Sequence, residues 1–307
     1  MRLSIMCFLV FGVSQILWTQ TNIVISAQNR LYKDLDKAME NPDSVYHLNL
    51  SFQSLQVFPT DLFLFKNLET VNLSFNHLTE LPDNIGQLKG LKRINLRGNL
   101  IEELPNSFSS LTNLENLELA QNPISIFPTQ IRHLNNLTTL NFSFCSILHL
   151  PEFIGNLTKL ENLNLTKNLL DTLPSSFTKL QFLKTLNLGS NRFYCIPEEV
   201  CALQNLEYLD IMINQIVSIP NSISNLKKLK TLLIGSNRLN AINISLFEIK
   251  SLELLDLSYN NPLTIIPESI AQLENLKTID IVGTLLTEER KLSLIKLLPN
   301  CEVIQKN

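Results

Sequence analysis

Catalysis or metal binding would require His, Cys or carboxylate side chains at spacings that bring them together. No HExxH pattern, paired-Cys zinc spacing, phosphate-cradling glycine loop or nucleophile elbow occurs in the chain. The adjacent pairs Glu102–Glu103 and Glu288–Glu289 are typical of solvated surface carboxylates. The four histidines stand far apart, at His47, His77, His133 and His149. We therefore expect no catalytic residues, no metal site and no cofactor.

The cysteines indicate little chemistry. Beyond Cys7 there are four, at Cys145, Cys195, Cys201 and Cys301. Cys195 and Cys201 are the only local disulfide candidates, and Cα atoms more than about 7 Å apart would prevent the bond. A disulfide and two free thiols both remain open. Asn-x-Ser/Thr glycosylation signals recur, but most follow from the frequent use of Asn and Thr.

Composition narrows the class of protein. The 307-residue chain is 45% hydrophobic but only 7% aromatic, so its apolar content is mostly Leu and Ile. Its formal charge is −3, from 25 basic and 28 acidic residues. No strongly basic face is expected, which argues against a nucleic-acid partner.

The N-terminus has the pattern of a secretory signal. Arg2 precedes an apolar run from Leu3 to Trp18, and the small residues Ser26 and Ala27 allow cleavage before Gln28. The run is short for a membrane span of roughly 20 residues and contains Ser14. We expect a signal peptide at 1–27 and no membrane span in the mature chain. An uncleaved anchor is the alternative.

An internal period organises the rest of the chain. Proline recurs every 23 residues, at Pro59, Pro82, Pro105, Pro128, Pro151, Pro174, Pro197 and Pro220. Asn243 takes the next place, and Pro267 follows 24 residues later. On this period the chain divides into eleven units, which begin at Val45, Leu68, Leu91, Leu114, Leu137, Leu160, Leu183, Leu206, Leu229, Leu252 and Leu276. Chance cannot keep this register over about 240 residues, so the period defines the fold.

Each unit reads LxxLxLxxNxLxxLPxxIxxLxx, as in LETVNLSFNHLTELPDNIGQLKG at 68–90. The alternation in VNLSF predicts a strand with Val71 and Leu73 turned inward. The Asn at position nine, such as Asn76, can bond backbone groups that the following turn leaves unpaired. Cys145 interrupts this row of asparagines, and a thiol is a small, weak donor that the slot can accept. The proline fixes the start of an outer segment.

No unit can bury its leucines alone, so stacked units must share one continuous core. The pattern resembles the leucine-rich-repeat family, specifically the LPxxIxxL kind of Ras-group scaffolds and of many bacterial surface and secreted proteins. We expect an α/β leucine-rich-repeat solenoid, or horseshoe, with a parallel concave sheet and short 3-10 or irregular convex segments. The expected organisation is an N-terminal cap at 28–44, eleven repeats at 45–286 and a C-terminal cap at 287–307.

The two caps should cover an otherwise open core. In the N-terminal cap, Leu31, Leu35, Ala38 and Met39 are predicted to share one helical face that ends at 41–43. In the C-terminal cap, Thr287 can begin a helix that Pro299 ends. CEVI at 301–304 is predicted to be extended.

The concave sheet is the candidate binding surface, because positions three, five, seven and eight of each unit should face outward. Position five is a polar row that Leu233 interrupts. An apolar group, here called the rear cluster, is predicted to gather around this break; it comprises Tyr208, Met212, Ile213, Leu233, Leu254 and Tyr259. Phe52 and Phe75, here called the front pair, form a smaller candidate. Contiguous exposed apolar residues mark interaction sites, although they can also shield the sheet or lie under a cap.

These observations predict a secreted or otherwise extracytoplasmic, non-catalytic recognition module that binds a protein or glycan through its concave face. One alternative is a structural envelope or adhesion component, or a self-associating spacer. Another is an intracellular signalling scaffold, against which the signal segment counts. The identity of the ligand and the oligomeric state stay open.

The signal interpretation can be tested by N-terminal sequencing of the protein isolated from its source. We expect the mature chain to begin at Gln28, because the small residues before it suit signal peptidase. A cytosolic protein that retains Met1 would rule this out.

Overall fold

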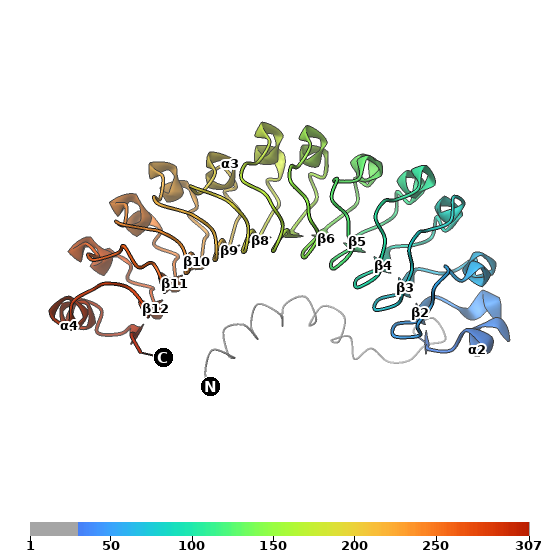
Figure 1. Ribbon diagram of the computed structural model, residues 1–307, viewed down its shortest axis with the longest axis horizontal. Coiled ribbons are helices and arrows are strands. Elements are labelled where there is room, and N and C mark those ends of the chain that lie inside the picture. Colours follow the sequence, from blue (N-terminus) through green and yellow to red (C-terminus); the bar gives the residue numbers. More distant parts are fainter. Residues whose placement is uncertain (1–29, 307) are drawn as a thin grey trace.

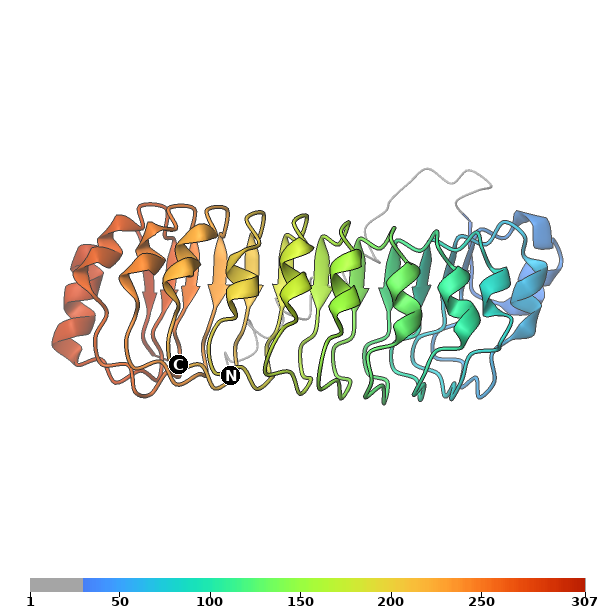
Figure 2. The same cartoon turned by 90° about the horizontal axis from the view of Figure 1, so that it is seen from above.

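The computed structural model describes residues 30–306. The predicted signal peptide at 1–27 therefore lies outside the described residues, as do residues 28 and 29 of the predicted N-terminal cap. The described chain forms a curved arc with strands along its inner, concave side and short helical segments along its outer, convex side (Figure 1). Seen from above, successive turns of chain stack side by side along the long axis (Figure 2). The predicted leucine-rich-repeat solenoid is confirmed.

Within the described residues the strands form one sheet of 13, all parallel and in chain order. Each repeat supplies its third to fifth positions, so that Thr70 pairs with Arg93 and Asn72 with Asn95. The eleven repeats form β2 to β12, and one strand precedes and one follows them. The strands are β1 (Leu31–Tyr32), β2 (His47–Asn49), β3 (Thr70–Asn72), β4 (Arg93–Asn95), β5 (Asn116–Glu118), β6 (Thr139–Asn141), β7 (Asn162–Asn164), β8 (Thr185–Asn187), β9 (Tyr208–Asp210), β10 (Thr231–Leu233), β11 (Leu254–Asp256), β12 (Thr278–Asp280) and β13 (Glu302–Ile304).

The convex side consists mainly of single 3-10 turns, as predicted. In most repeats a proline with extended backbone immediately precedes the turn, for example Pro105 with φ −66° and ψ 154°. Fixed φ and the missing N–H suit proline to this place. One repeat instead forms a short α-helix. The segments are η2 (Pro42–Ser44), η3 (Thr60–Leu64), η4 (Ile85–Gln87), η5 (Asn106–Ser110), η6 (Thr129–His133), η7 (Glu152–Asn156), η8 (Ser175–Lys179), α3 (Glu198–Cys201), η9 (Asn221–Asn225), η10 (Ile244–Glu248) and η11 (Glu268–Gln272).

The core is a single column between the sheet and the convex turns. Leu68, Val71 and Leu73 of one repeat are all buried, and Ile85 and Leu88 return to the same interior from the convex side. The equivalent residues of neighbouring repeats continue one cluster from Tyr32 to Leu298. Because each layer is closed only by its neighbours, the repeats must fold as one domain.

Asparagine at position nine ties each repeat to the one before it. The side-chain nitrogen of Asn76 donates to the carbonyls of Leu50 and Leu73, both at 2.9 Å. Its side-chain oxygen accepts the N–H groups of Gln53 and Leu55, both at 3.0 Å. Most repeats use the same set of bonds, for example at Asn122 and Asn260. The predicted role of this row is confirmed.

Cys145 is the weak member of that row. Its Sγ donates to the carbonyl of Leu119 over 3.6 Å. In the neighbouring repeats, the N–H groups of Ile101 and Ile147 donate to asparagine oxygens at 3.1 and 3.0 Å. The equivalent Ile124 N–H meets a thiol, whose pKa burial raises to about 11. One good acceptor and one good donor are therefore missing at this junction.

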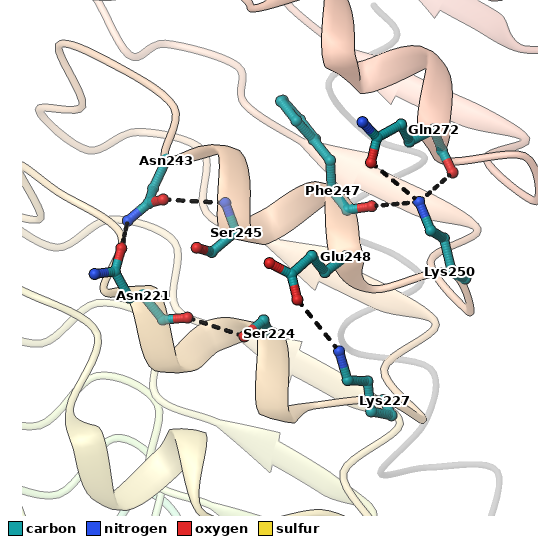
Figure 3. A network of polar contacts seen from close by, with 9 residues as sticks. All are labelled: Asn221, Ser224, Lys227, Asn243, Ser245, Phe247, Glu248, Lys250 and Gln272. Carbon is teal, nitrogen blue, oxygen red and sulfur yellow. Dashed lines mark hydrogen bonds and ion pairs between the residues drawn. The ribbon is translucent and has the colours of Figure 1, made fainter.

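Asn243 shows why one repeat can dispense with its proline. Its side-chain oxygen accepts the Ser245 N–H at 3.0 Å and so caps η10. Its nitrogen donates to the Asn221 side chain of the previous repeat at 2.8 Å (Figure 3). Lys250 extends this convex network by donating to Phe247 and Gln272, each at 3.0 Å. Side-chain bonds thus replace the rigidity that proline supplies elsewhere.

The N-terminal end differs in part from its prediction. Helix α2 (Leu35–Met39) begins after Asp34, whose side chain accepts the Lys37 N–H. Leu31 does not share its face, since it lies in β1 and is half exposed. The expected helical position of Leu31 is therefore wrong. The apolar spacing was compatible with a helix, but pairing with β2 gives the backbone of 31–32 a ladder instead.

The C-terminal end follows its prediction. Thr287 accepts the Arg290 N–H and begins α4 (Glu288–Leu297), which ends before Pro299. Strand β13 then adds the last rung of the sheet, and Cys301 and Val303 pack partly buried against the core. All four cysteines between residues 30 and 306 are free thiols. No helix of this part of the chain has the length and apolar character needed to cross a membrane.

Substitutions in the asparagine row should change stability in opposite directions. We expect Cys145→Asn to raise the free energy of unfolding by about 1 kcal/mol, because it supplies the missing donor and acceptor. Asn122→Ala should lower it by about 1–3 kcal/mol, because buried backbone groups lose their partners. Urea unfolding followed by circular dichroism would measure both. An unchanged midpoint for both variants would contradict the role of the row.

Candidate functional site

Position five is a supporting row rather than the freely hydrated surface that its polarity suggested. Its side chains lie at the ends of the strands, and most accept the backbone N–H two residues further on. Asn72 accepts from Ser74 and Asn164 from Thr166, both at 3.0 Å. Asn141, Asp210 and Asp256 are buried. The expectation that position five faces outward is therefore wrong for the buried members, because these side chains turn back to satisfy the backbone where each strand ends.

Position eight forms the rim of the concave face, and its backbone is left-handed in every repeat. The φ angles are 59° at Phe52, 54° at Ile213 and 53° at Tyr259, and glycine occupies the position in two repeats. Each rim N–H donates to the position-seven carbonyl of the next repeat, as Ile213 does to Gly235 at 3.1 Å. The conformation is thus imposed by stacking. It suits Gly, Asn or Ser, but a β-branched residue such as Ile is strained there.

The rear cluster lies on neighbouring strands in register, since Tyr208 pairs with Thr231 and Thr231 with Leu254. Ile213 is 57% exposed and Tyr259 is 39% exposed, both on the rim. Tyr208, Met212 and Leu254 are half-buried. The expectation that Leu233 lies at the surface is wrong, because it is only 6% exposed. It packs at position five between Asp210 and Asp256 and forms the floor of the cluster.

The front pair is a compact aromatic stack. The rings of Phe52 and Phe75 lie 4.6 Å apart with an interplanar angle of 11°. Phe52 is 73% exposed. Arg97 continues the stack, with its guanidinium carbon 5.4 Å from the Phe75 ring. Phe75 also lies over Gly98, where an added Cβ would come within 2.6 Å of the ring. The pair is therefore held in place, and its outer ring is open to solvent.

Four carboxyl groups replace asparagine in the buried position-five row. Burial raises the pKa of Glu118 to about 7, although a hydrogen bond from Asn141 and the positive charge of Arg97 both lower it. Burial likewise raises the pKa of Asp210 and of Asp280 to about 6, and the nearby charge of Asp256 adds to both shifts. The pKa of Asp256 is itself raised by burial. Two of the four, Asp210 and Asp256, lie in repeats that carry the rear cluster, and Asp280 lies in the next repeat.

A charge ladder along position two was missed by the sequence reasoning. Glutamate and lysine alternate there over much of the chain, and four Lys–Glu pairs bridge adjacent repeats. Two examples are Lys230–Glu207 at 2.7 Å and Lys277–Glu253 at 2.6 Å. Listing position two repeat by repeat would have revealed the alternation. Each of these exposed pairs contributes little stability. They do, however, engage Lys230 and Lys277 in ion pairs with glutamates of the position-two row.

Comparison with family models accounts for most of the chain. A model described as leucine-rich repeat region matches residues 175–306. Models described as leucine-rich repeat match residues 43–101, 66–124 and 136–157. The chain belongs to the leucine-rich-repeat family. No curated protein matches it.

Solved structures share this leucine-rich-repeat fold. The functional domain of InlJ from Listeria monocytogenes matches with a TM-score of 0.70 and 21% identity, over 90% of this chain and 56% of that one. The plant peptide hormone receptor RGFR1 in complex with RGF2 matches with a TM-score of 0.59 and 26% identity, over 83% of this chain and 54% of that one. The ectodomain of the Arabidopsis thaliana membrane receptor kinase GASSHO1/SCHENGEN3, in complex with CASPARIAN STRIP INTEGRITY FACTOR 2, matches with a TM-score of 0.56 and 25% identity, over 77% of this chain and 34% of that one. The chain thus spans about half or less of each.

The raised carboxyl pKa values predict that stability falls as the pH rises. A carboxyl whose pKa is higher in the folded state destabilises the fold above its unfolded pKa, and the full cost is reached above the folded pKa. For Asp210 this window runs from its ordinary value of 3.8 to about 6. We expect Asp210→Asn to raise the free energy of unfolding at pH 7 by about 1–3 kcal/mol and to change it little at pH 3.5.

The control is the reverse change, Asn164→Asp, in a repeat whose position-five amide makes the same backbone bond. It should create a similar loss of stability between pH 4 and 7. Urea unfolding across this pH range measures both variants. Parallel curves for the wild type and Asp210→Asn would show that burial does not shift this group.

Proposed function

We propose that this leucine-rich-repeat protein is a non-catalytic recognition module that binds a protein partner through its concave face, with the rear cluster as the main anchor. The observation that carries the proposal is the exposure of Ile213 and Tyr259 beside Met212 on one rim. Large apolar side chains that remain exposed together mark interaction surfaces, and Tyr and Met are favoured in them. The front pair, Phe52 and Phe75, is proposed as a second contact.

Costs to stability in the same repeats support the choice of the rear cluster. Ile213 holds a left-handed backbone that disfavours β-branched residues. Asp210, Asp256 and Asp280 bury charge at places where most other repeats have neutral asparagine. Local features that lower stability tend to persist where function needs them. Repeats 8 and 10 combine a buried carboxyl group with an exposed apolar rim residue.

The fold relatives support binding as the general activity. RGFR1 and GASSHO1/SCHENGEN3 were each solved in complex with a named partner, so leucine-rich-repeat ectodomains of this architecture can hold ligands. Together with the signal pattern at 1–27, this supports an extracytoplasmic location for the present chain. The partner itself is a separate question.

Self-association is the second candidate function, because the C-terminal end carries exposed apolar side chains. Leu292 and Ile295 lie on the solvent side of α4, and Leu285 is exposed just before the helix. Measuring the mass in solution by light scattering, with and without Leu292→Ser, tests this. A monomer at all concentrations would remove the candidate.

Ile213→Asn separates binding from stability. We expect it to raise the free energy of unfolding by about 1 kcal/mol, because asparagine tolerates the left-handed backbone. We expect the same change, combined with Met212→Gln, to weaken capture of the partner at least about tenfold, because an apolar anchor is lost. Capture from culture or host material by the immobilised mature chain, quantified by mass spectrometry, measures binding.

The matched control is Ile126→Asn, because Ile126 is 79% exposed in the segment between β5 and η6, away from the concave strands. It should leave capture unchanged. A partner that is bound equally well by the Met212→Gln/Ile213→Asn variant would end the proposal for the rear cluster. If binding is lost only when Phe52 is changed, the front pair is the main contact instead of the rear cluster.

A further inference from the structure

The concave face carries different charges at its two ends. In repeats 8 to 11, positions three, five, seven and eight include Asp210, Asp256 and Asp280 and no basic residue. In repeats 1 to 4, the same positions include Arg93 and Arg97 with a single carboxylate. The rear end of the binding face is therefore acidic, although the chain as a whole is close to neutral.

Within residues 30–306, no basic side chain forms an ion pair with these rear carboxyl groups. Lys230 and Lys277, which follow the same strands at position two, form ion pairs with Glu207 and Glu253 instead. Asp256 and Asp280 are direct neighbours on β11 and β12. The charge of Asp256 adds to the burial that raises the pKa of Asp280 and of Asp210.

Asp256 has an unused acceptor at the centre of the group. Its Oδ1 accepts the Ser258 N–H at 2.8 Å. Its Oδ2 is buried and has no hydrogen-bond partner in the described part of the chain, and the residue is 0% exposed. Both oxygens and the Ser258 Oγ lie against Gly235, where an added Cβ would be 2.9, 3.1 and 2.7 Å away from them. The Ser258 hydroxyl also hydrogen-bonds this carboxyl group. An unpartnered buried carboxyl oxygen is unfavourable, so this group is suited to a donor from outside.

The rim beside this carboxyl carries one small residue between two large ones. The Ile213 N–H donates to Gly235 and the Ser236 N–H to Ser258, so the three neighbouring repeats are held together in order at the rim. The rim residues at this point are Ile213, Ser236 and Tyr259, and only the middle one is small. Two apolar side chains thus flank a serine close to buried negative charge. Lysine and arginine suit such a place, because they combine an apolar stem with a cationic head.

We propose that the rear cluster binds a polypeptide segment in which one arginine or lysine is flanked by apolar residues, with the cationic head beside Ser236 and facing Asp256. The apolar neighbours would pack on Ile213 and Tyr259. This inference rests on the proposed function and names the chemistry of its partner. Binding requires a modest displacement of the side chains that now cover the carboxyl, and the charge interaction is strong because the site excludes water.

Other ligand chemistries fit less well. An acidic or phosphate-bearing ligand would be repelled by the three carboxyl groups. A glycan needs several free polar partners, but the position-five groups here already accept backbone N–H groups. Within residues 30–306 no three His, Cys, Asp or Glu side chains gather as a metal-binding group.

The experiment uses the complete mature chain and two heptapeptides that differ only at the centre. In one peptide a central arginine is flanked on each side by one phenylalanine, one leucine and one glycine. In the other, citrulline replaces the arginine; citrulline is neutral and nearly isosteric with arginine. We expect the arginine peptide to bind at least about tenfold more tightly by calorimetry at pH 7.5, and the difference to shrink at high salt. Equal affinities would overturn the inference.

Substitutions then test which carboxyl groups cause the preference for arginine. Asp256→Asn/Asp280→Asn should abolish the preference for arginine, and its fold should be retained because asparagine occupies position five elsewhere. Asp171→Asn, an exposed change outside the concave strands, removes a charge and should preserve the preference. A preference that survives the double substitution would overturn the inference. If the natural partner is lost with Met212→Gln/Ile213→Asn but not with Asp256→Asn/Asp280→Asn, the inference fails and the proposed function stands.

Discussion

The asparagine amide at position nine is the interaction on which this solenoid depends. After each three-residue strand the chain must turn away from the sheet, and this exposes backbone donors and acceptors inside the core. One side chain satisfies groups of two successive repeats at once, as Asn76 does for Leu55 of the repeat before it and for Leu73 of its own repeat. The leucines supply the apolar burial, but without this amide the turns between them would leave buried polar groups unmatched.

The rim of the concave face follows from the same constraint. The turn places position eight in a left-handed conformation next to the amide, and large side chains at this position are exposed. Phe52, Ile213 and Tyr259 occupy this position, while Gly98 and Gly283 leave space for the aromatic ring of the preceding repeat. The scaffold therefore offers one variable side chain per repeat at regular spacing. Variation there changes the surface without changing the core.

Much of the fold could be predicted from the sequence because the same pattern recurs in successive repeats. This recurrence makes the structural positions of Leu209 and Asn214 unambiguous, whereas a single strand considered alone would not. The strand at Leu31 is not predictable, because this residue lies outside the period, where its spacing suits a helix as well as a strand. The period also does not show that position five turns back to the backbone, so the sequence indicates an exposed Leu233 although it is a buried floor residue.

The candidate surface was predictable only in outline. Apolar residues at Met212, Ile213 and Tyr259 are evident from the aligned repeats, but their exposure depends on the curvature of the rim and on the size of their neighbours. The carboxyl groups of Asp210 and Asp256 gave no signal beyond polarity, since their raised pKa values arise from burial. Their relation to Gly235 required coordinates.

The thiol at Cys145 also has a consequence for how the molecule comes apart. A solenoid behaves nearly as a one-dimensional chain of units, whose cooperativity is limited by its weakest interface. The junction between repeats 4 and 5 lacks the amide found at the neighbouring junctions, so separating these two repeats costs less hydrogen bonding than separating their neighbours. The front pair lies on one side of that junction and the rear cluster on the other. A local opening at Cys145 would therefore divide the single core into two stretches of repeats, each with its own apolar surface.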